Sequence, residues 1–253
     1  MDSAALARHP GPHDHFVQLY QGLDALVDTV AEYVDTGLRR GEAAVIIATP
    51  EHREAFLARL DAAEQGAEQG RLRVLDAEQT LAAFMANGMP QWNAFRQVVG
   101  GLIAELRLRY PTVRAYGEMV DVLWRRGERD AAIRLEEYWN ELGKLQTFSL
   151  LCAYRMDPLD GGSYGGALES VCEAHTHLMP ARDCAQFDDA VMDAVRKVLA
   201  QPFADALLKV SAKHGAATQM PAGQATLLWL WQNMPRAAEK ILSETRARLS
   251  PAG

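Results

Sequence analysis

Between residues 14 and 155, short runs of consecutive apolar residues alternate with longer segments in which apolar residues recur every three or four positions. The short runs predict strands, and the run at 43–48 (AAVIIA) is typical of a strand that is covered on both faces. The longer segments, such as residues 23–38, predict helices with one apolar face. The predicted strands span residues 15–20, 43–48, 71–75, 112–116 and 148–154.

Strands separated by helices favour an α/β fold, in which a mainly parallel five-stranded sheet is flanked by helices. We expect this domain to cover residues 14–156, after a disordered lead over residues 1–13. Residues 157–180 begin with a glycine-rich stretch that is typical of a linker. Residues 181–253 predict a helical C-terminal region, with a break or kink at Pro235.

The composition is that of a globular protein and argues against two classes of partner. Hydrophobic residues make up 49% of the 253 positions, but no apolar run approaches the roughly 20 residues that span a bilayer. With 26 basic and 33 acidic residues, the chain carries a formal charge of -7. Nucleic-acid binding usually relies on a basic face, so we expect no membrane and no directly bound nucleic acid. The cysteines are too few for a disulfide framework, which favours a cytoplasmic location.

Several segments of the first 155 residues resemble one family of sensory domains. They are HFVQLY (15–20), GLRRGEAAVIIATPEHREAF (37–56), RAYGEMVDVLW (114–124), LEEYWNEL (135–142) and FSLLCAY (148–154), and CEAHTHLMP (172–180) resembles the segment that often follows. The family is MEDS, named for methanogens, methylotrophs and a dichloromethane-responsive repressor. The resemblance implies a ligand-sensing domain related in fold to RecA/KaiC-type ATPases. Members are usually attached to kinase or DNA-binding modules or act as regulators, and the ligands proposed for them are small hydrocarbon derivatives.

The chain lacks the phosphate-binding loop of those ATPases. They carry GxxxxGK[ST] after the first strand, where backbone N–H groups, a lysine and a hydroxyl hold phosphate and magnesium. Here residues 20–26 (YQGLDAL) contain one glycine, no lysine and an acid, Asp24. ATP hydrolysis by that mechanism is therefore disfavoured, and we expect the protein not to be an enzyme.

A doubly wound sheet binds ligands in the crevice at the carboxyl ends of its strands. Six residues predicted at or near that crevice combine aromatic, hydroxyl, imidazole, amide and carboxylate groups, which suit a small, partly apolar organic ligand. They are Tyr20, Thr49, His52, Glu118, Trp139 and Asn140. Each also has a structural interpretation. The aromatic residues can belong to the core, His52 can lie on the surface, Glu118 can cap a helix or form an ion pair, and Asn140 can satisfy backbone groups.

The segment after the glycine-rich stretch holds Cys172, His175 and His177 within six residues. A transition-metal site needs three or four such donors, so these residues predict a metal or haem-type site, with Cys184 or Glu173 as a further ligand. The alternative is that the two histidines cap a helix and pack against the sheet domain. The spacing matches no common zinc module, and both interpretations stay open.

Three functions fit these features. We favour a non-catalytic sensor, in which a small organic ligand shifts the domain between two states and the C-terminal helices pass the change on. An enzyme using His15, His52, Glu118 and Asp121 is the second, although no spacing of nucleophile and base is visible. The third is a scaffold whose C-terminal helices bind a protein partner or a second copy. The apolar positions for that role, which a buried core explains equally well, are Leu227, Leu228, Trp231, Met234, Ile241 and Leu242.

Overall fold

The computed structural model describes residues 3–164, 168–179, 184–218 and 220–249. The chain divides into two compact units, and each is described by itself. The first unit comprises Met1–Arg155 and Ala174–Met179, and the second comprises Met156–Glu173 and Pro180–Gly253. The stretch predicted as a linker, 157–180, is therefore divided: residues 174–179 belong to the first unit, and the rest belongs to the second.

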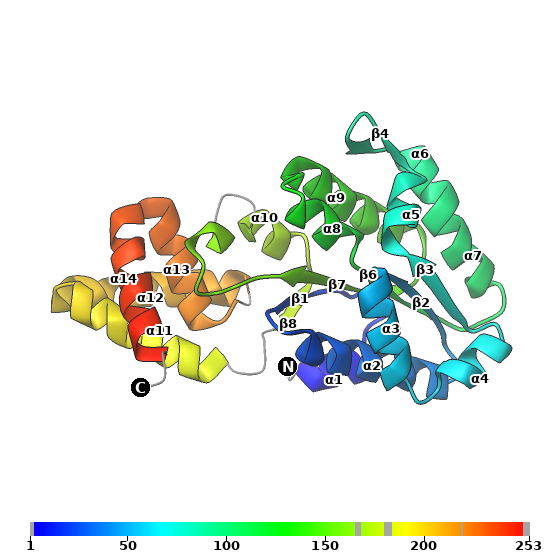
Figure 1. The fold of residues 1–253 in the computed structure, drawn as a ribbon, viewed down its shortest axis with the longest axis horizontal. Coiled ribbons are helices and arrows are strands. Elements are labelled where there is room, and N and C mark those ends of the chain that lie inside the picture. Colours follow the sequence, from blue (N-terminus) through cyan, green and yellow to red (C-terminus); the bar gives the residue numbers. More distant parts are fainter. Residues whose placement is uncertain (1–2, 165–167, 180–183, 219, 250–253) are drawn as a thin grey trace. The chain divides into compact units, whose positions relative to one another are not determined.

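The first unit is an α/β domain built on a parallel six-stranded sheet, which confirms the predicted fold class (Figure 1). The strand order is β3-β2-β6-β7-β1-β8, and every neighbouring pair is parallel. The strands are β1 (His15–Tyr20), β2 (Ala43–Ala48), β3 (Leu72–Asp76), β6 (Val113–Gly117), β7 (Ser149–Arg155) and β8 (His177–Met179). A separate antiparallel pair consists of β4 (Met85–Ala86) and β5 (Met89–Pro90).

The sixth strand corrects the five-stranded prediction. β8 has three residues, and its register places His177, Leu178 and Met179 beside Phe16, Val17 and Gln18 of β1. A run of three residues carries too little periodicity to be separated from a loop. β1 therefore has neighbours on both sides, and all six of its residues are buried.

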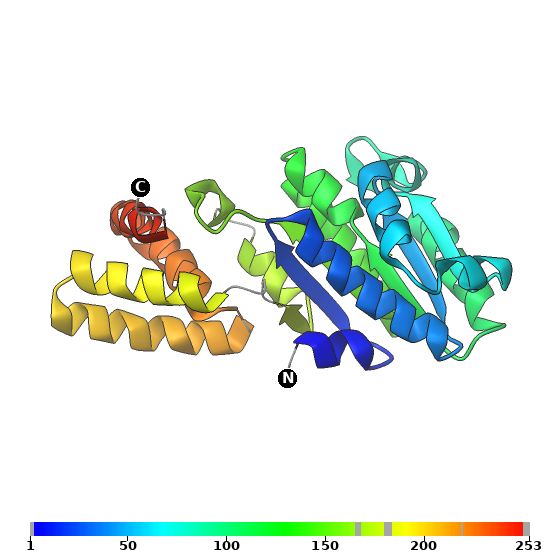
Figure 2. The ribbon, with the colours of Figure 1, turned by 60° about the horizontal axis from the view of Figure 1, so that its bottom comes forward.

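Helices cover both faces of the sheet, and Figure 2 shows α2 (Leu23–Arg39) crossing one of them. The apolar residues of α2 recur at helical spacing and enter a core shared with β1, β2 and Tyr116. α3 (Pro50–Arg59) begins as predicted, with Thr49 at the N-cap and proline at the first helical position. The same face carries α1 (Ser3–Arg8) and α4 (Ala63–Glu68).

The opposite face is covered by the helices between β3 and β7. The two that frame the site described below are α8 and α9, which pack against each other. The full set of helices between β3 and β7 is α5 (Ala77–Ala82), α6 (Trp92–Phe95), the π-helical turn η1 (Arg96–Gly100), α7 (Gly101–Arg107), α8 (Met119–Arg125) and α9 (Arg129–Leu145).

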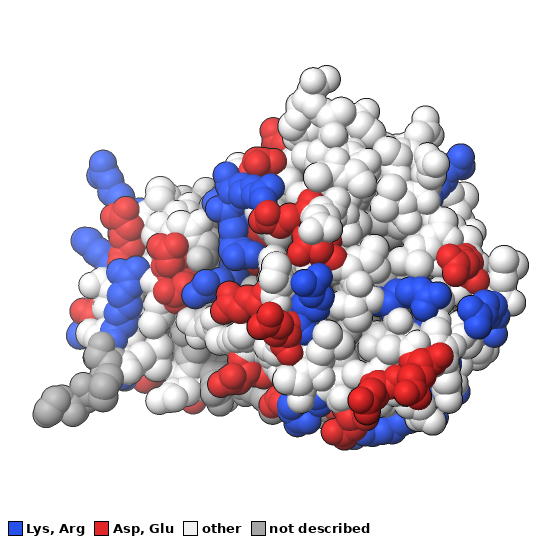
Figure 3. Space-filling view, turned by 45° about the vertical axis from the view of Figure 1, so that its right-hand side comes forward, with Lys and Arg blue, Asp and Glu red and all other residues white. Residues whose placement is uncertain are grey.

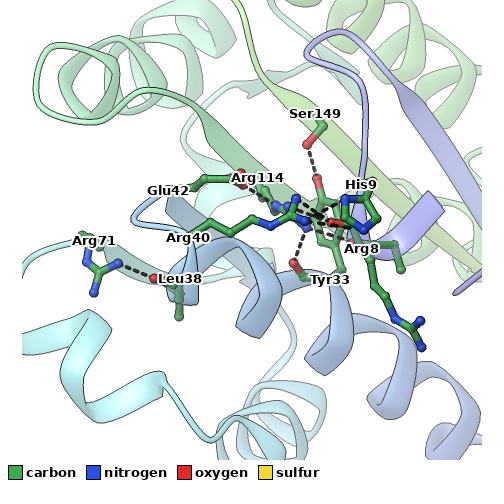
Figure 4. Close-up of polar contacts among 10 residues, drawn as sticks. Arg8, His9, Tyr33, Leu38, Arg40, Glu42, Arg71, Arg114 and Ser149 are labelled. Carbon is green, nitrogen blue, oxygen red and sulfur yellow. Dashed lines mark hydrogen bonds and ion pairs between the residues drawn. The ribbon is translucent and has the colours of Figure 1, made fainter. Parts of the chain in front are cut away.

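A buried arginine in β6 ties α1 and α2 to the sheet (Figure 4). Arg114 is 1% exposed, and its Nη1 donates to the carbonyls of Ala7 and Tyr33, at 2.9 Å each. Its Nε donates to the Glu42 carboxylate at 2.5 Å, and its guanidinium lies 5.3 Å from the centroid of the Tyr33 ring. Gly37 makes room for this side chain, because a Cβ there would lie 2.7 Å from Arg114 Cδ.

This network explains why the N-terminal segment differs from the predicted disordered lead. Residues 3–8 form α1, with Leu6 and Ala7 buried, and the carbonyl of Arg8 also accepts from Arg114. The anchoring groups are backbone carbonyls, and the donor lies more than a hundred residues away, so the local sequence gives no signal of it. The first two residues of the predicted lead lie outside the described part of the chain.

The second unit is helical, as predicted, and contains α11 (Cys184–Val198), α12 (Gln201–Thr218), α13 (Ala222–Asn233) and α14 (Pro235–Leu249). Pro235 ends one helix and starts the next. The second unit also includes η2 (Gly161–Tyr164) and α10 (Leu168–Glu173), which precede these helices in sequence. Of the six apolar residues considered for a partner face, Leu227, Leu228, Ile241 and Leu242 are buried in the core, whereas Trp231 and Met234 are partly exposed.

The surface charge bears on nucleic-acid binding, and the length and hydropathy of the helices bear on membrane insertion. On the face shown in Figure 3, acidic and basic side chains are interspersed and do not gather into one basic patch. Among the described residues, no helix is both long and apolar enough to cross a membrane.

Candidate functional site

The strand order creates a switch point between β2 and β6. After β2 the chain moves outward to β3, and after β6 it moves the other way to β7, although β2 and β6 are neighbours. The connections therefore diverge to opposite faces, and folds of this kind bind ligands at the carboxyl ends of the strands at such a point. Thr49 follows β2 and Glu118 follows β6, so both stand at this switch point.

Glu118 is the centre of a buried polar cluster. It is 1% exposed and accepts hydrogen bonds from three sides: from the backbone N–H of Thr49, from His52 Nδ1 at 2.6 Å and from the Tyr116 hydroxyl at 3.0 Å. Burial acts to raise the pKa of Glu118, but the His52 and Thr49 donors outweigh it and hold the pKa below the ordinary value. The carboxylate is thus kept charged inside the protein.

A second carboxylate, Asp121, lies one helical turn further on in α8 and is 0% exposed. Its Oδ2 accepts from the Tyr20 hydroxyl at 3.2 Å and pairs with Arg125 Nε at 3.0 Å, and its Oδ1 accepts from the backbone N–H of Arg155 at 2.9 Å. Burial raises the pKa of Asp121, and the charge of Glu118 adds to the increase, although the Arg155 and Arg125 donors oppose it.

The two acids form one constellation around Tyr20. The Tyr20 ring meets the His52 ring edge-on, with 6.1 Å between centroids, while its hydroxyl bonds Asp121. The pKa of Tyr20 is raised, first by burial and then by the charges of Asp121 and Glu118. The arrangement places two carboxylates, an imidazole and a phenol in one buried cluster, a set that can accept and donate hydrogen bonds.

The structure brings together four of the six residues predicted for the ligand site: Tyr20, Thr49, His52 and Glu118. Trp139 lies in the aromatic core against Phe95, and its ring faces Gly117, directly before Glu118. Asn140 belongs to a different cluster, where its Oδ1 lies 3.0 Å from His15 Nδ1 and its Nδ2 donates to the carbonyl of Ala174. Tyr116 was not among the predicted residues, although it precedes Glu118 by two positions and so projects to the same side as that residue.

A second buried polar cluster lies around Glu136 of α9. His15 Nε2 is 3.3 Å from Cys152 Sγ and 3.4 Å from Glu136 Oε2, and His175 Nε2 is 3.5 Å from Glu136 Oε1. Tyr154 also donates to Glu136 Oε1, at 2.6 Å. Burial acts to raise the pKa of Glu136, but the two histidines outweigh it and lower the pKa, whereas burial and then Glu136 raise the pKa of the Cys152 thiol.

The residues predicted as metal ligands are placed differently from one another. His175 joins the cluster around Glu136. His177 stacks on Phe16 and lies 3.8 Å from Asp14, and Cys172 is a buried residue of α10 in the second unit. Among the described residues, the group of side chains that could hold a metal ion is His15, Glu136, Cys152 and His175.

The fold is an α/β domain of the kind that binds ligands at the carboxyl ends of its strands, and the buried polar cluster of Glu118 lies at that end of the sheet. The family model described as MEDS, the methanogen/methylotroph, DcmR sensory domain, matches residues 14–176. This match covers more than half of the chain, so the chain belongs to the MEDS family of sensory domains. The matched range includes the polar cluster of Glu118 and all four residues of the group that could hold a metal ion. A comparison with curated proteins gave no significant match.

Proposed function

We propose that this protein is a non-catalytic sensor that binds a small organic molecule at the crevice formed by Tyr20, Thr49, His52, Glu118 and Asp121. The observation that carries the proposal is the buried Glu118 at the switch point, held charged by Thr49 and His52. Keeping an ionised carboxylate out of water is costly unless its partners compensate, and perturbed buried groups in a crevice are typical of functional sites.

The charges of the crevice narrow the class of ligand. Glu118 and Asp121 repel anions, so organic acids and nucleotides are poor candidates. A neutral or cationic hydrogen-bond donor, such as a short alcohol or amine, satisfies the carboxylates, and the rings of Tyr20 and Phe56 beside His52 offer apolar contact. We therefore expect the preferred ligands to carry a hydroxyl or amino group on a short carbon skeleton.

Signalling can begin at Asp121. Its Oδ1 holds the backbone N–H of Arg155, which is the last residue of the first unit before the chain enters the second. A ligand that competes with Tyr20 for Asp121 shifts this carboxylate and changes the hydrogen bond to Arg155. The ligand needs only a different affinity for the two arrangements, and no chemical step, to alter the second unit. A protein partner or self-association of the C-terminal helices would receive the change in the cytoplasm.

A non-catalytic role agrees with the start of α2. Gly22 is the N-cap and Asp24 lies in the first helical turn, where an ATPase would bind a phosphate. An acid at this place repels phosphate, so no ATP turnover is part of the proposal.

The test is a thermal-shift screen of alcohols, amines, aldehydes, halogenated hydrocarbons, organic acids and nucleotides on the full chain. We expect hits among alcohols or amines, with a stabilisation of about 2.7 kcal/mol at a ligand concentration one hundred times the dissociation constant. Glu118→Gln, which keeps the shape and removes the charge, should weaken each hit. Glu137→Gln, on the exposed side of α9, is the matched control and should leave each hit unchanged.

Two outcomes contradict the proposal. The first is hits that bind Glu118→Gln and wild type equally. A cavity of about 450 Å³ in the second unit, lined by Leu199 and Met234 among others, is the alternative location, and Leu199→Trp would then abolish the hits. The second is the absence of any shift across all the compound classes.

A further inference from the structure

The cluster around Glu136 gathers four metal-ligating side chains from distant parts of the chain. His15 is the first residue of β1, Glu136 lies in the middle of α9, Cys152 is central in β7, and His175 precedes β8. One ligand atom from each lies within 4.8 Å of the others. All four belong to the first unit, so a single folded domain builds the cluster.

The spacing of the donor atoms fits a single tetrahedral ion. Metal–ligand bonds of about 2.0 Å to nitrogen or oxygen and about 2.3 Å to sulfur give tetrahedral edges of roughly 3.3–3.5 Å. The His15–Cys152 and His15–Glu136 separations are 3.3 and 3.4 Å, and Cys152 Sγ lies 3.8 Å from Glu136 Oε2. His175 Nε2 lies 3.5 Å from the other carboxylate oxygen, Oε1, and all four ligand atoms lie within 4.8 Å of one another. Side-chain adjustments of up to about 1 Å would bring these atoms to the tetrahedral spacing around one ion.

Asn140 and Tyr154, which lie beside the cluster, orient the side chains of His15 and Glu136 by hydrogen bonds. The side-chain amide of Asn140 donates through Nδ2 to the carbonyl of Ala174 at 2.8 Å, which fixes its Oδ1 as the atom facing His15. An amide oxygen can only accept, so His15 Nδ1 carries the proton and its Nε2 presents a lone pair to the cluster. Tyr154 orients Glu136 in the same way, by donating to Oε1. Such second-shell bonds are typical of metal sites.

The charges also balance. One carboxylate, one thiolate and two neutral imidazoles carry two negative charges, which a divalent cation cancels. The side chains of His15, Glu136 and His175 are 7%, 1% and 0% exposed, and Cys152 is fully buried, so a bound ion would be enclosed by protein. A closed four-ligand set is typical of a structural rather than a catalytic metal.

We propose that His15, Glu136, Cys152 and His175 bind one transition-metal dication, preferably Zn²⁺, as a structural site that joins β1, α9, β7 and the segment leading into β8. Mixed imidazole, thiolate and carboxylate ligands suit Zn²⁺ and its spectroscopic substitute Co²⁺ better than Mg²⁺ or Ca²⁺, which take oxygen ligands. Asn140 is a positioning residue in this site.

The same geometry contains a competing arrangement. Cys152, His15 and Asn140 are linked in the order of a cysteine nucleophile, its base and an orienting amide. A nucleophile must reach a substrate, whereas Cys152 is 0% exposed and has a carboxylate beside it. The enclosure of Cys152 among three further ligand side chains therefore suits a metal site better than a nucleophile. The experiment separates the two.

The first measurement is elemental analysis of the full chain after expression with added Zn²⁺, followed by chelation and titration with Co²⁺ alone. We expect close to one zinc per chain. The Co²⁺ form should show a thiolate-to-cobalt charge-transfer band together with visible absorption of a tetrahedral ion. Because this band is read on the wild-type protein, it reports thiolate ligation even if a variant fails to fold. Chelation should also lower the melting temperature of the first unit.

Variants then assign the ligands. Cys152→Ser should remove the charge-transfer band, and His15→Gln should abolish stoichiometric metal. Asn140→Ala should weaken Co²⁺ binding by about 10–100-fold, the usual effect of losing a second-shell partner. Cys172→Ser is the matched control, since it changes the buried cysteine of the second unit, and it should bind Co²⁺ as the wild type does.

Three results would overturn the proposal: wild-type protein that takes up neither zinc nor Co²⁺, a charge-transfer band that survives in Cys152→Ser but vanishes in Cys172→Ser, or rapid alkylation of Cys152 by iodoacetamide in the folded protein. The last result would show an accessible thiol and favour the nucleophile.

Discussion

Replacing Arg114 with methionine should strongly destabilise the first unit. Methionine keeps much of the length of the side chain but removes the guanidinium, leaving the carbonyls of Ala7 and Tyr33 and the carboxylate of Glu42 without their donor. Breaking a buried ion pair by removing one partner costs about 3–5 kcal/mol. Since Glu42 is 14% exposed and keeps some hydration, we expect the lower half of that range.

The assay is denaturant unfolding of the full chain, followed by the fluorescence of the tryptophans and by circular dichroism. For a unit of this size, each kcal/mol corresponds to about 2–4 °C in melting temperature, so the loss should be visible in a thermal scan as well. Arg114→Lys is the informative comparison. It keeps the charge beside Glu42 but loses the planar fork that reaches several acceptors, and it should fall between wild type and Arg114→Met. Hydrogen exchange in α1 should accelerate in both variants.

A loss below about 1 kcal/mol in Arg114→Met would refute the reasoning, because the unsatisfied acceptors would then cost nothing measurable. Equal losses in the methionine and lysine variants would refute the role assigned to the ion pair with Glu42.

Two further predictions concern stability. Gly37→Ala should destabilise the first unit by about 1–3 kcal/mol, because the new Cβ would meet Arg114. Gly101→Ala is the control, because nothing lies within 4 Å of its Cβ. In the same unfolding assay it should leave stability unchanged or raise it by up to about 1 kcal/mol. The folded state lowers the pKa of Glu118 from its ordinary 4.5, so its charge stabilises the fold above that pH, and the contribution is lost as the pH falls through the folded pKa. The difference in unfolding free energy between wild type and Glu118→Gln should therefore shrink between about pH 6 and pH 3. A difference that stays constant over this range would contradict the prediction.

Much of the fold could be predicted because its signals are local. The run at 43–48, the Thr49-Pro50 start of α3 and the break at Pro235 each depend on a few neighbouring residues, and the structure confirms all three. β8 and α1 could not be predicted in the same way. β8 is a strand because β1 lies beside it, and α1 is held by carbonyl contacts to Arg114.

The closeness of Thr49 and Glu118 could be predicted from a topological rule, which needs only the order of strands and the loops after them. It placed Thr49 and Glu118 correctly relative to each other because both follow strands that are neighbours in the sheet. The rule gave no rotation for α9, and that rotation determines that Trp139 enters the aromatic core while Asn140 reaches His15. The cluster of Glu136 likewise depends on the register of β1 against β7, which no local pattern encodes.

The position of β8 has a consequence for solubility. An unpaired edge strand is a template for intermolecular β-pairing and aggregation. Without β8, the edge of the sheet would be β1, six residues that are buried throughout. A fragment that stops at residue 156, where the strand and helix pattern ends, would present that edge to every other copy in solution. We therefore expect a fragment that ends at residue 156 to aggregate, and a fragment that extends to Met179, which keeps β8 beside β1, to aggregate less.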